Sequence, residues 1–335
     1  MTACDKQGEM FVLTCVGMYG KAAWQYIDSQ KDTYIPAPTT EHTIVMRIAK
    51  ECERFGDVVW FQKDTDDKPT KKKPEMPTKS SHFDFLFKFH KNPIGLRPIS
   101  ANPNTGEVPT ARVVNVALKF IEAYAMDRIW HDEVLVTNGD IVPRSSVMIG
   151  CDQMHIRHLN SMLSRGHLDI NTLKFAVYDF TSMYTKFPHG MIKNAVNSAL
   201  TYAFRADAAS MGWTEIYLAT PHHDQYQYRS CYWTAQKDLS EHAAKTHKTI
   251  DLTGLIARVA FLVDNSYVFF GGQMFHQQIG IAMGLIPAGL VASMVCFYYE
   301  GAYLRRCLRR YADLRASPNT LDAELRHQKN RCTFI

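Results

Sequence analysis

The chain has 335 residues, 46% of them hydrophobic and 21% charged, which is enough for one large domain or two ordinary ones with a proper core. Its formal net charge of +5 is compatible with a polyanionic partner, although many other proteins share such a value. The eight cysteines form no C-x-x-C pair, which argues against a zinc ribbon or disulfide framework and favours reduced thiols. No signal peptide is recognisable, so the sequence indicates an intracellular protein and leaves a nuclear location open.

Residues 1–82 form an N-terminal region with few predicted elements. Met10–Val16 has the pattern of a short buried strand, and Thr40–Phe55 has that of a helix. The stretch from Lys63 to Ser81 holds three prolines and a run of three lysines, Lys71 to Lys73. We interpret it as a flexible loop with solvated charges, and phosphate contact is the alternative.

A basic hairpin is predicted to open the next region, residues 83–173. Alternating residues from Phe83 to Phe89 indicate a strand, Asn92-Pro93 and Gly95 supply turn chemistry, and Arg97 begins the return strand. Its cationic residues are Lys88, His90, Lys91 and Arg97. Lysine and arginine on a hairpin are able to grip a triphosphate, and an exposed hairpin with solvated charges is the alternative.

The predicted strand Lys174–Asp179 ends on a carboxylate, Asp179. A lone buried charge costs several kcal/mol unless it is paired or binds a metal. A carboxylate at the end of a strand is well placed to hold a divalent metal, and Tyr184 follows five positions later. A turn-forming or helix-capping role for Asp179 is the alternative.

Further elements are predicted along the chain by hydrophobic period and turn residues. These are helices over Ala111–Met126, His155–Arg165, Ile192–Phe204 and Leu252–Asp264, a hairpin over Tyr267–Gln278 that turns at Gly271-Gly272, and a helix from Pro287 to about Leu314. The segment 220–249, with four histidines that lack metal-ligand spacing, is interpreted as an exposed polar insertion.

The segment Q-Q-I-G-I-A-M-G-L-I-P-A-G-L, from Gln277 to Leu290, carries glycines directly before a helix. Such glycines let a backbone approach a ligand closely, and close packing of the loop on a sheet is the alternative. The spacing fits neither a dinucleotide-binding fingerprint nor a P-loop. Because glycines and Pro287 interrupt the apolar run Ile279–Tyr299, we interpret that run as a loop entering a buried helix rather than as a membrane span.

Three of these segments, taken in order, resemble the reverse transcriptases of retroelements, and most closely the Penelope-like group. They are F-K-F-H-K-N-P-I-G-L-R-P-I-S (87–100), F-A-V-Y-D-F-T-S-M-Y-T-K-F-P-H (175–189) and V-F-F-G-G-Q-M-F-H-Q-Q-I-G-I-A-M-G (268–284), the last followed by F-Y-Y-E. The first is similar to the family's fingers segment, the second to palm motif A and the third to motif B. Each motif alone is modest, whereas their joint order and spacing are specific.

The resemblance implies an RNA-directed DNA polymerase that adds deoxynucleotides to a primer 3′ end. Asp179, helped by the carbonyl of Phe180, would then bind two catalytic Mg²⁺ ions, one activating the primer oxygen and the other holding pyrophosphate. Tyr184 would exclude the 2′-hydroxyl of a ribonucleotide. The implied partners are an RNA template, a DNA primer and dNTPs, with no membrane.

The same resemblance implies three contacts with substrate and reveals two departures. Arg97, with Lys88 or Lys91, would contact the triphosphate, and Gly284 would line the nascent base pair. Leu285-Ile286 stands where the family has Ser-Pro or Thr-Asn. Ala282 stands where the family usually has a proline. Both departures leave open whether the template pocket is shaped as in the family.

Motif C, an aromatic-x-Asp-Asp turn, has no match, because no Asp-Asp pair occurs after Asp67. The stretch Tyr311-Ala312-Asp313-Leu314 lies in a segment of helical character, whereas motif C needs a hairpin. Phe334-Ile335 resembles the pair that precedes Asp-Asp. We therefore expect the chain to be truncated just before motif C and to be inactive by itself.

The predicted fold class is α+β, with an antiparallel sheet and packed helices that form the fingers and part of the palm of a right-hand polymerase, and without a thumb. The predicted regions are residues 1–82, a fingers-like region 83–173 and a partial palm 174–335. Three alternatives stay open: a non-catalytic nucleic-acid-binding remnant of a retroelement, a viral RNA-dependent RNA polymerase, and an unrelated α+β protein.

Overall fold

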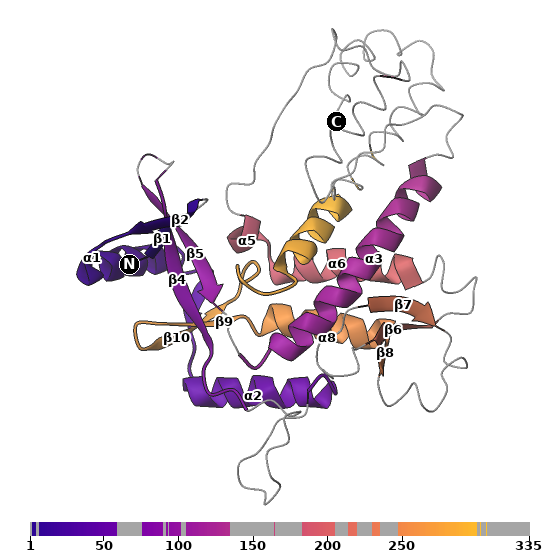
Figure 1. Cartoon of the computed structure of the whole chain (residues 1–335), viewed down its shortest axis with the longest axis horizontal. Coiled ribbons are helices and arrows are strands. Elements are labelled where there is room, and N and C mark those ends of the chain that lie inside the picture. The colour runs from indigo at the N-terminus through magenta and orange to yellow at the C-terminus, as the bar shows by residue number, and fades with distance from the viewer. Residues whose placement is uncertain are drawn as a thin grey trace, which may run out of the picture. The chain divides into compact units, whose positions relative to one another are not determined.

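The structure is a computed structural model that describes residues 2–4, 7–58, 76–89, 92, 94–101, 105–134, 164, 183–204, 214–219, 230–234, 247–299, 302 and 306. The chain forms two compact units. The first comprises Met1–Ala125 with Ser182–Ala292, and the second comprises Met126–Thr181 with Ser293–Ile335. Most of the described elements belong to the first unit (Figure 1).

Helices and strands are mixed along the chain, which confirms the α+β class. The helices are α1 (Val16–Ser29), α2 (Glu41–Arg54), α3 (Val108–Val134), α5 (Met183–Lys186), α6 (His189–Ala203) and α8 (Leu252–Asp264), and residues 288–299 are also helical. The strands are β1 (Thr2–Cys4), β2 (Gln7–Val12), β3 (Tyr34–Pro36), β4 (Ser81–Lys88), β5 (Gly95–Ala101), β6 (Glu215–Ala219), β7 (Ser230–Thr234), β8 (His247–Asp251), β9 (Tyr267–Phe270) and β10 (Gln273–Gln277).

The seven-stranded sheet of the first unit is built around β4. Its strand order is β2-β1-β4-β9-β10-β3, with β5 also paired to β4. The sheet is mixed rather than purely antiparallel, because β4 runs parallel to β1 and β9. The predicted hairpin is confirmed as β4 and β5, whose register pairs Phe85 with Pro98 and Lys88 with Gly95.

An aromatic core lies between α1 and one face of this sheet. Alternation along β4 buries Phe83 and Phe85 on that face, where Phe85 contacts Tyr26 of α1 at a ring-centroid distance of 5.5 Å. Ala23 and Ile27 of α1 are buried in the same cluster. Their spacing of four residues places both on one helix face, so α1 closes this side of the sheet.

The N-terminal strand prediction is wrong at its end. The strand β2 stops at Val12, and Val16, the last residue of the predicted strand, begins α1. Cys15 is the N-cap and keeps an extended backbone, while its carbonyl accepts from the amide of Tyr19 at 2.9 Å. The last residue that we assigned to the strand, Val16, therefore starts the helix α1.

Most other predicted elements are confirmed, with shifted ends. These are the helices at α2, α3, α6 and α8, the hairpin of β9 and β10, and the first part of the helix that follows Pro287, over residues 288–299. The predicted end of that last helix near Leu314 lies outside the described residues. For α2 the N-cap is Thr40, whose hydroxyl accepts from the amide of Thr43. The predicted strand Lys174–Asp179 and the predicted helix His155–Arg165, apart from Ser164, lie outside the described residues.

Segment 220–249 is not simply an exposed polar insertion. Its described residues lie in β7 and β8, which flank β6 in a three-stranded antiparallel sheet. Trp233 of β7 is 8% exposed, and its ring lies 4.8 Å from that of Phe204 between centroids. The segment thus contributes an anchor to the core, and three of its four histidines, at 222, 223 and 242, lie outside the described residues.

Glu107, just before α3, has its carboxyl group buried although the residue as a whole is partly exposed. Burial raises its pKa above the usual 4.5, against the opposing effect of hydrogen bonds such as that from Ser81 Oγ at 3.0 Å. The folded state therefore holds this proton more tightly than the unfolded chain does. The resulting stabilisation is complete below pH 4.5 and is lost as pH rises through the raised pKa.

We expect Glu107→Gln to raise the thermal unfolding midpoint at pH 7.5, because the amide carries no charge to bury. The gain should vanish near pH 4, where Glu107 is protonated in both states. Differential scanning calorimetry at both pH values measures it, with Glu53→Gln on the exposed side of α2 as the control. A gain of equal size at the two pH values would contradict the assignment.

Candidate nucleotide-binding site

The three segments singled out in the sequence meet at one loop. We call residues 279–287, which connect β10 to the helix at 288–299, the glycine loop. It contacts β5 of the basic hairpin and the chain around α5, which follows Asp179 in the sequence. In Figure 1 the loop is the orange segment that leaves β10.

On one side the glycine loop contacts the strand β5. The amide of Ser100 donates to the carbonyl of Met283 at 2.6 Å. Gly284 has a φ of 124°, and a Cβ there would overlap with the carbonyl oxygen of Ser100. Only glycine permits both this backbone conformation and this approach. The alternative of close packing on the sheet is therefore realised at Gly284.

On the other side the loop is joined to the turn through α5. The carbonyl of Tyr184 accepts from the amide of Ile281 at 2.9 Å, and Gly280 donates to the carbonyl of Phe187 at 2.7 Å. An isolated bridge also pairs Pro188 with Ile279. Gly280 has a φ of 90°, and a Cβ there would overlap with the carbonyl oxygen of Tyr184. The loop thus fixes the backbone of the predicted sugar-discriminating residue.

Two of the loop's three residues that depart from the family pattern are buried. Ala282 and Leu285 are 6% and 7% exposed, whereas Ile286 is 41% exposed. Pro287 then begins the following helix, where its carbonyl accepts from the amide of Val291 at 2.9 Å. Ala282 and Leu285 therefore serve apolar packing. No described helix is long and apolar enough to cross a membrane.

Of the predicted substrate ligands, Lys88 and Arg97 lie on the hairpin β4–β5. The register pairs Lys88 with Gly95 and Leu86 with Arg97, so Lys88 and Arg97 share one face, opposite the buried face of Phe85. A Cβ on Gly95 would lie 3.7 Å from Lys88 Cδ, so the lysine stem passes close to the turn. The remaining predicted ligands, Asp179, Phe180 and Lys91, lie outside the described residues, as does His90.

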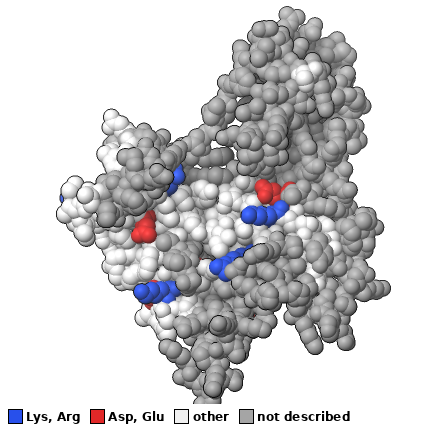
Figure 2. Space-filling view, in the orientation of Figure 1, with Lys and Arg blue, Asp and Glu red and all other residues white. Residues whose placement is uncertain are grey.

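Charge is spread thinly over the face drawn in Figure 2. The described Lys and Arg side chains on this face stand apart from one another, with uncharged surface between them. The formal charge of +5 is therefore not concentrated in a basic patch among the residues that this view describes.

A polar cluster that the sequence did not predict adjoins the turn after α5. Asp264, at the end of α8, accepts from Lys193 of α6 at 2.8 Å and lies 3.6 Å from His189 Nδ1. Its backbone carbonyl accepts from His276 Nε2 of β10 at 2.9 Å. Burial lowers the pKa of His189, and Asp264 opposes this. The cluster joins α6, α8 and β10.

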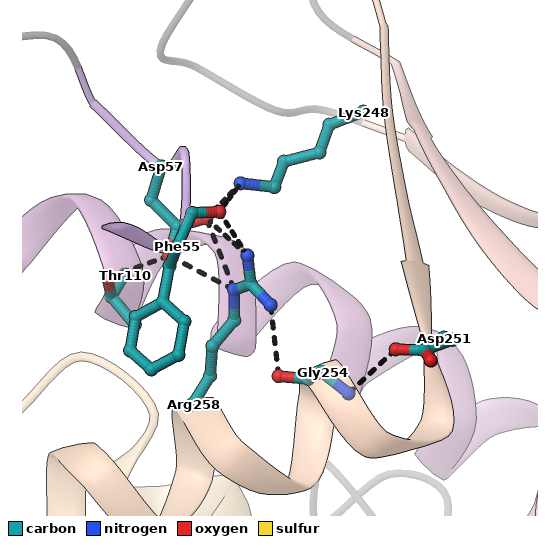
Figure 3. A network of polar contacts seen from close by, with 7 residues as sticks. All are labelled: Phe55, Asp57, Thr110, Lys248, Asp251, Gly254 and Arg258. Carbon is teal, nitrogen blue, oxygen red and sulfur yellow. Dashed lines mark hydrogen bonds and ion pairs between the residues drawn. The ribbon is translucent and has the colours of Figure 1, made fainter. Parts of the chain in front are cut away.

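A second unpredicted cluster is an ionic network centred on Asp57 (Figure 3). Its carboxylate has no exposed surface and accepts from Arg258 Nε at 3.1 Å, from Thr110 Oγ1 at 2.7 Å and from Lys248 Nζ. Arg258 and Lys248 also donate to the carbonyl of Phe55. Because these donors and acceptors satisfy one another, we assign the network a structural role in joining α2, α3, α8 and β8.

No metal site is formed by the described residues, among which no three His, Cys, Asp or Glu side chains come together as ligands. Asp179 and Phe180, the predicted Mg²⁺ ligands, lie outside that part of the chain. Metal binding by Asp179 stays a prediction.

Comparisons with known proteins give a remote structural likeness. No protein-family model matches the sequence, and no curated protein matches it. Among solved structures, the chain is similar to apo telomerase from Candida tropicalis, with 11% sequence identity and a TM-score of 0.37. The match covers 83% of this chain, which spans 44% of that telomerase chain.

Proposed function

We propose that the chain is a nucleic-acid polymerase domain of the reverse-transcriptase type, related to the Penelope-like group. In this proposal the glycine loop and the hairpin β4–β5 bind a deoxynucleoside triphosphate opposite an RNA template and at the end of a DNA primer. Asp179 binds the Mg²⁺ that accompanies the nucleotide. Lys88 and Arg97 contact the triphosphate, and Tyr184 faces the sugar.

One observation carries this proposal. The hairpin, the turn containing Tyr184 and the glycine loop are far apart in the sequence, and each bears one of the three family motifs. They meet through direct backbone contacts at Ser100 and Tyr184. Chance similarity of three separate segments gives no reason for the segments to adjoin, whereas a shared substrate site requires it.

The test is templated nucleotide retention by the chain. A primer without its terminal 3′-hydroxyl is annealed to an RNA template, so that a bound nucleotide is not incorporated, and labelled dGTP is added with Mg²⁺. We expect retention opposite a template cytosine and not opposite adenine. Asp179→Asn should reduce the retained dGTP at least about tenfold. Loss of a residue that only hydrogen-bonds to a metal ligand already lowers metal affinity by about that factor, and Asp179 is proposed as a ligand itself.

Asp28→Asn is the control, since the side chain of Asp28 on α1 is 68% exposed. Retention that is independent of the template base, or unchanged by Asp179→Asn, would contradict the proposal. Salt-sensitive binding of the primer–template with no retained nucleotide would identify a non-catalytic nucleic-acid-binding protein instead.

A further inference from the structure

Gln277, at the end of β10, is a buried polar residue with only 1% of its surface exposed. Its side-chain amide donates to the carbonyl of Tyr184 at 3.2 Å and to that of Ile279 at 3.0 Å. Burying an amide is costly unless it is hydrogen-bonded, and here one NH₂ group serves two backbone carbonyls. The contact with Tyr184 spans 93 positions of sequence.

The carbonyl of Tyr184 is consequently held from two directions. Gln277 Nε2 and the backbone amide of Ile281 both donate to it, and Gly280 packs against it without a side chain. Three residues near the start of the glycine loop thus define where the Tyr184 backbone lies. The side chain of Tyr184 is attached to that backbone, so a shift of the carbonyl group also moves the aromatic ring.

We propose that Gln277 is a positioning residue that sets the preference for deoxyribonucleotides over ribonucleotides by fixing the backbone of Tyr184. The inference rests on the proposed function, because it concerns the same nucleotide site. An aromatic ring that rejects a single hydroxyl group must be placed to within about 0.5 Å. Gln277 supplies that accuracy through its two hydrogen bonds and does not itself touch the nucleotide.

Gln277→Met tests this role, since methionine keeps the length of the side chain and removes both donors. Gln278→Met is the matched control, because Gln278 is the exposed neighbour and undergoes the same chemical change. The first readout is the ratio of dGTP to GTP retained in the templated assay. The second is hydrogen exchange of the peptide 279–287, which contains the Ile281 amide bonded to Tyr184.

We expect Gln277→Met to lower the dGTP-to-GTP ratio at least about tenfold, chiefly through stronger GTP retention. Exchange in the peptide 279–287 should become faster, while Gln278→Met changes neither quantity. Tyr184→Ala separates the two effects, because it removes the ring and keeps the carbonyl. It should lower the ratio and leave the exchange as in the wild type.

An unchanged ratio in folded Gln277→Met overturns this inference alone, provided that the wild type retains nucleotide. A wild-type chain without templated retention overturns the proposed function, and with it the role of Gln277 in sugar selection. If Gln277→Met does not fold by circular dichroism, Gln277→Asn replaces it. That variant keeps an amide but withdraws it by one methylene, and the same outcomes decide.

Discussion

Replacing Asp57 by alanine is expected to lower the free energy of unfolding by about 3–5 kcal/mol, since it leaves buried cations without their counter-charge. Arg258 is 6% exposed, and the side chain of Lys248 is 14% exposed. Both lie against the Asp57 carboxylate, which also accepts from Thr110. Urea denaturation followed by circular dichroism measures the loss as a lower midpoint at an unchanged slope.

Two further variants identify the origin of that loss. Asp28→Ala removes a carboxylate from an exposed pair with Lys31 and should change stability by no more than about 0.5 kcal/mol. The double variant Asp57→Ala/Arg258→Met removes the unpaired guanidinium as well, so it should be more stable than the sum of the two single changes predicts. Strict additivity would show that the ions are not coupled.

Alanine at Gly280 or at Gly284 is the second change with a large expected effect. Both glycines have a positive φ, and in both a Cβ would overlap with a backbone oxygen, of Tyr184 and of Ser100 respectively. Backbone oxygens are not flexible, so overpacking of about 1–3 kcal/mol adds to about 1–2 kcal/mol of backbone strain. We expect each variant to lose about 2–5 kcal/mol of stability in urea denaturation.

Two other glycines serve as controls that separate the cost of steric overlap from the cost of backbone strain. Gly272 has a φ of 85° and nothing within 4 Å of an added Cβ, so Gly272→Ala should cost only the backbone strain of about 1–2 kcal/mol. Gly289 has open space and lies in the helix at 288–299, where alanine should stabilise by up to about 1 kcal/mol. Similar losses in Gly284→Ala and Gly272→Ala would refute the close contact with Ser100.

The elements that could be predicted are those with local signals. The helix α2 has a threonine cap and an apolar face that buries Ile44 and Ile48, and the hairpin of β9 and β10 has Gly271-Gly272 at its turn. The helix α1 was missed because its N-cap is Cys15, which offers no capping side-chain bond. The strands β7 and β8 were missed because their apolar alternation is short and polar residues surround it.

The sequence motifs identify segments that lie together in the structure, but they do not reveal the contacts between those segments. The motifs named the hairpin, the turn at Tyr184 and the glycines, and the structure brings these together. No pattern revealed which backbone each glycine approaches, because such a contact joins residues that are remote in sequence. The Asp57 network was hidden for the same reason, since 201 positions separate Asp57 from Arg258.

The pairing of β3 with β10 has a consequence for how the protein is made. The register pairs Pro36 of β3 with Phe275 of β10. During synthesis β3 therefore leaves the ribosome long before its partner strand β10 has been made. Until then β3 has an unsatisfied edge, and such edges attract other chains. The large sheet therefore closes late, and long-range strand pairing of this kind makes folding slow. Production of this chain should depend on protecting its N-terminal strands during synthesis.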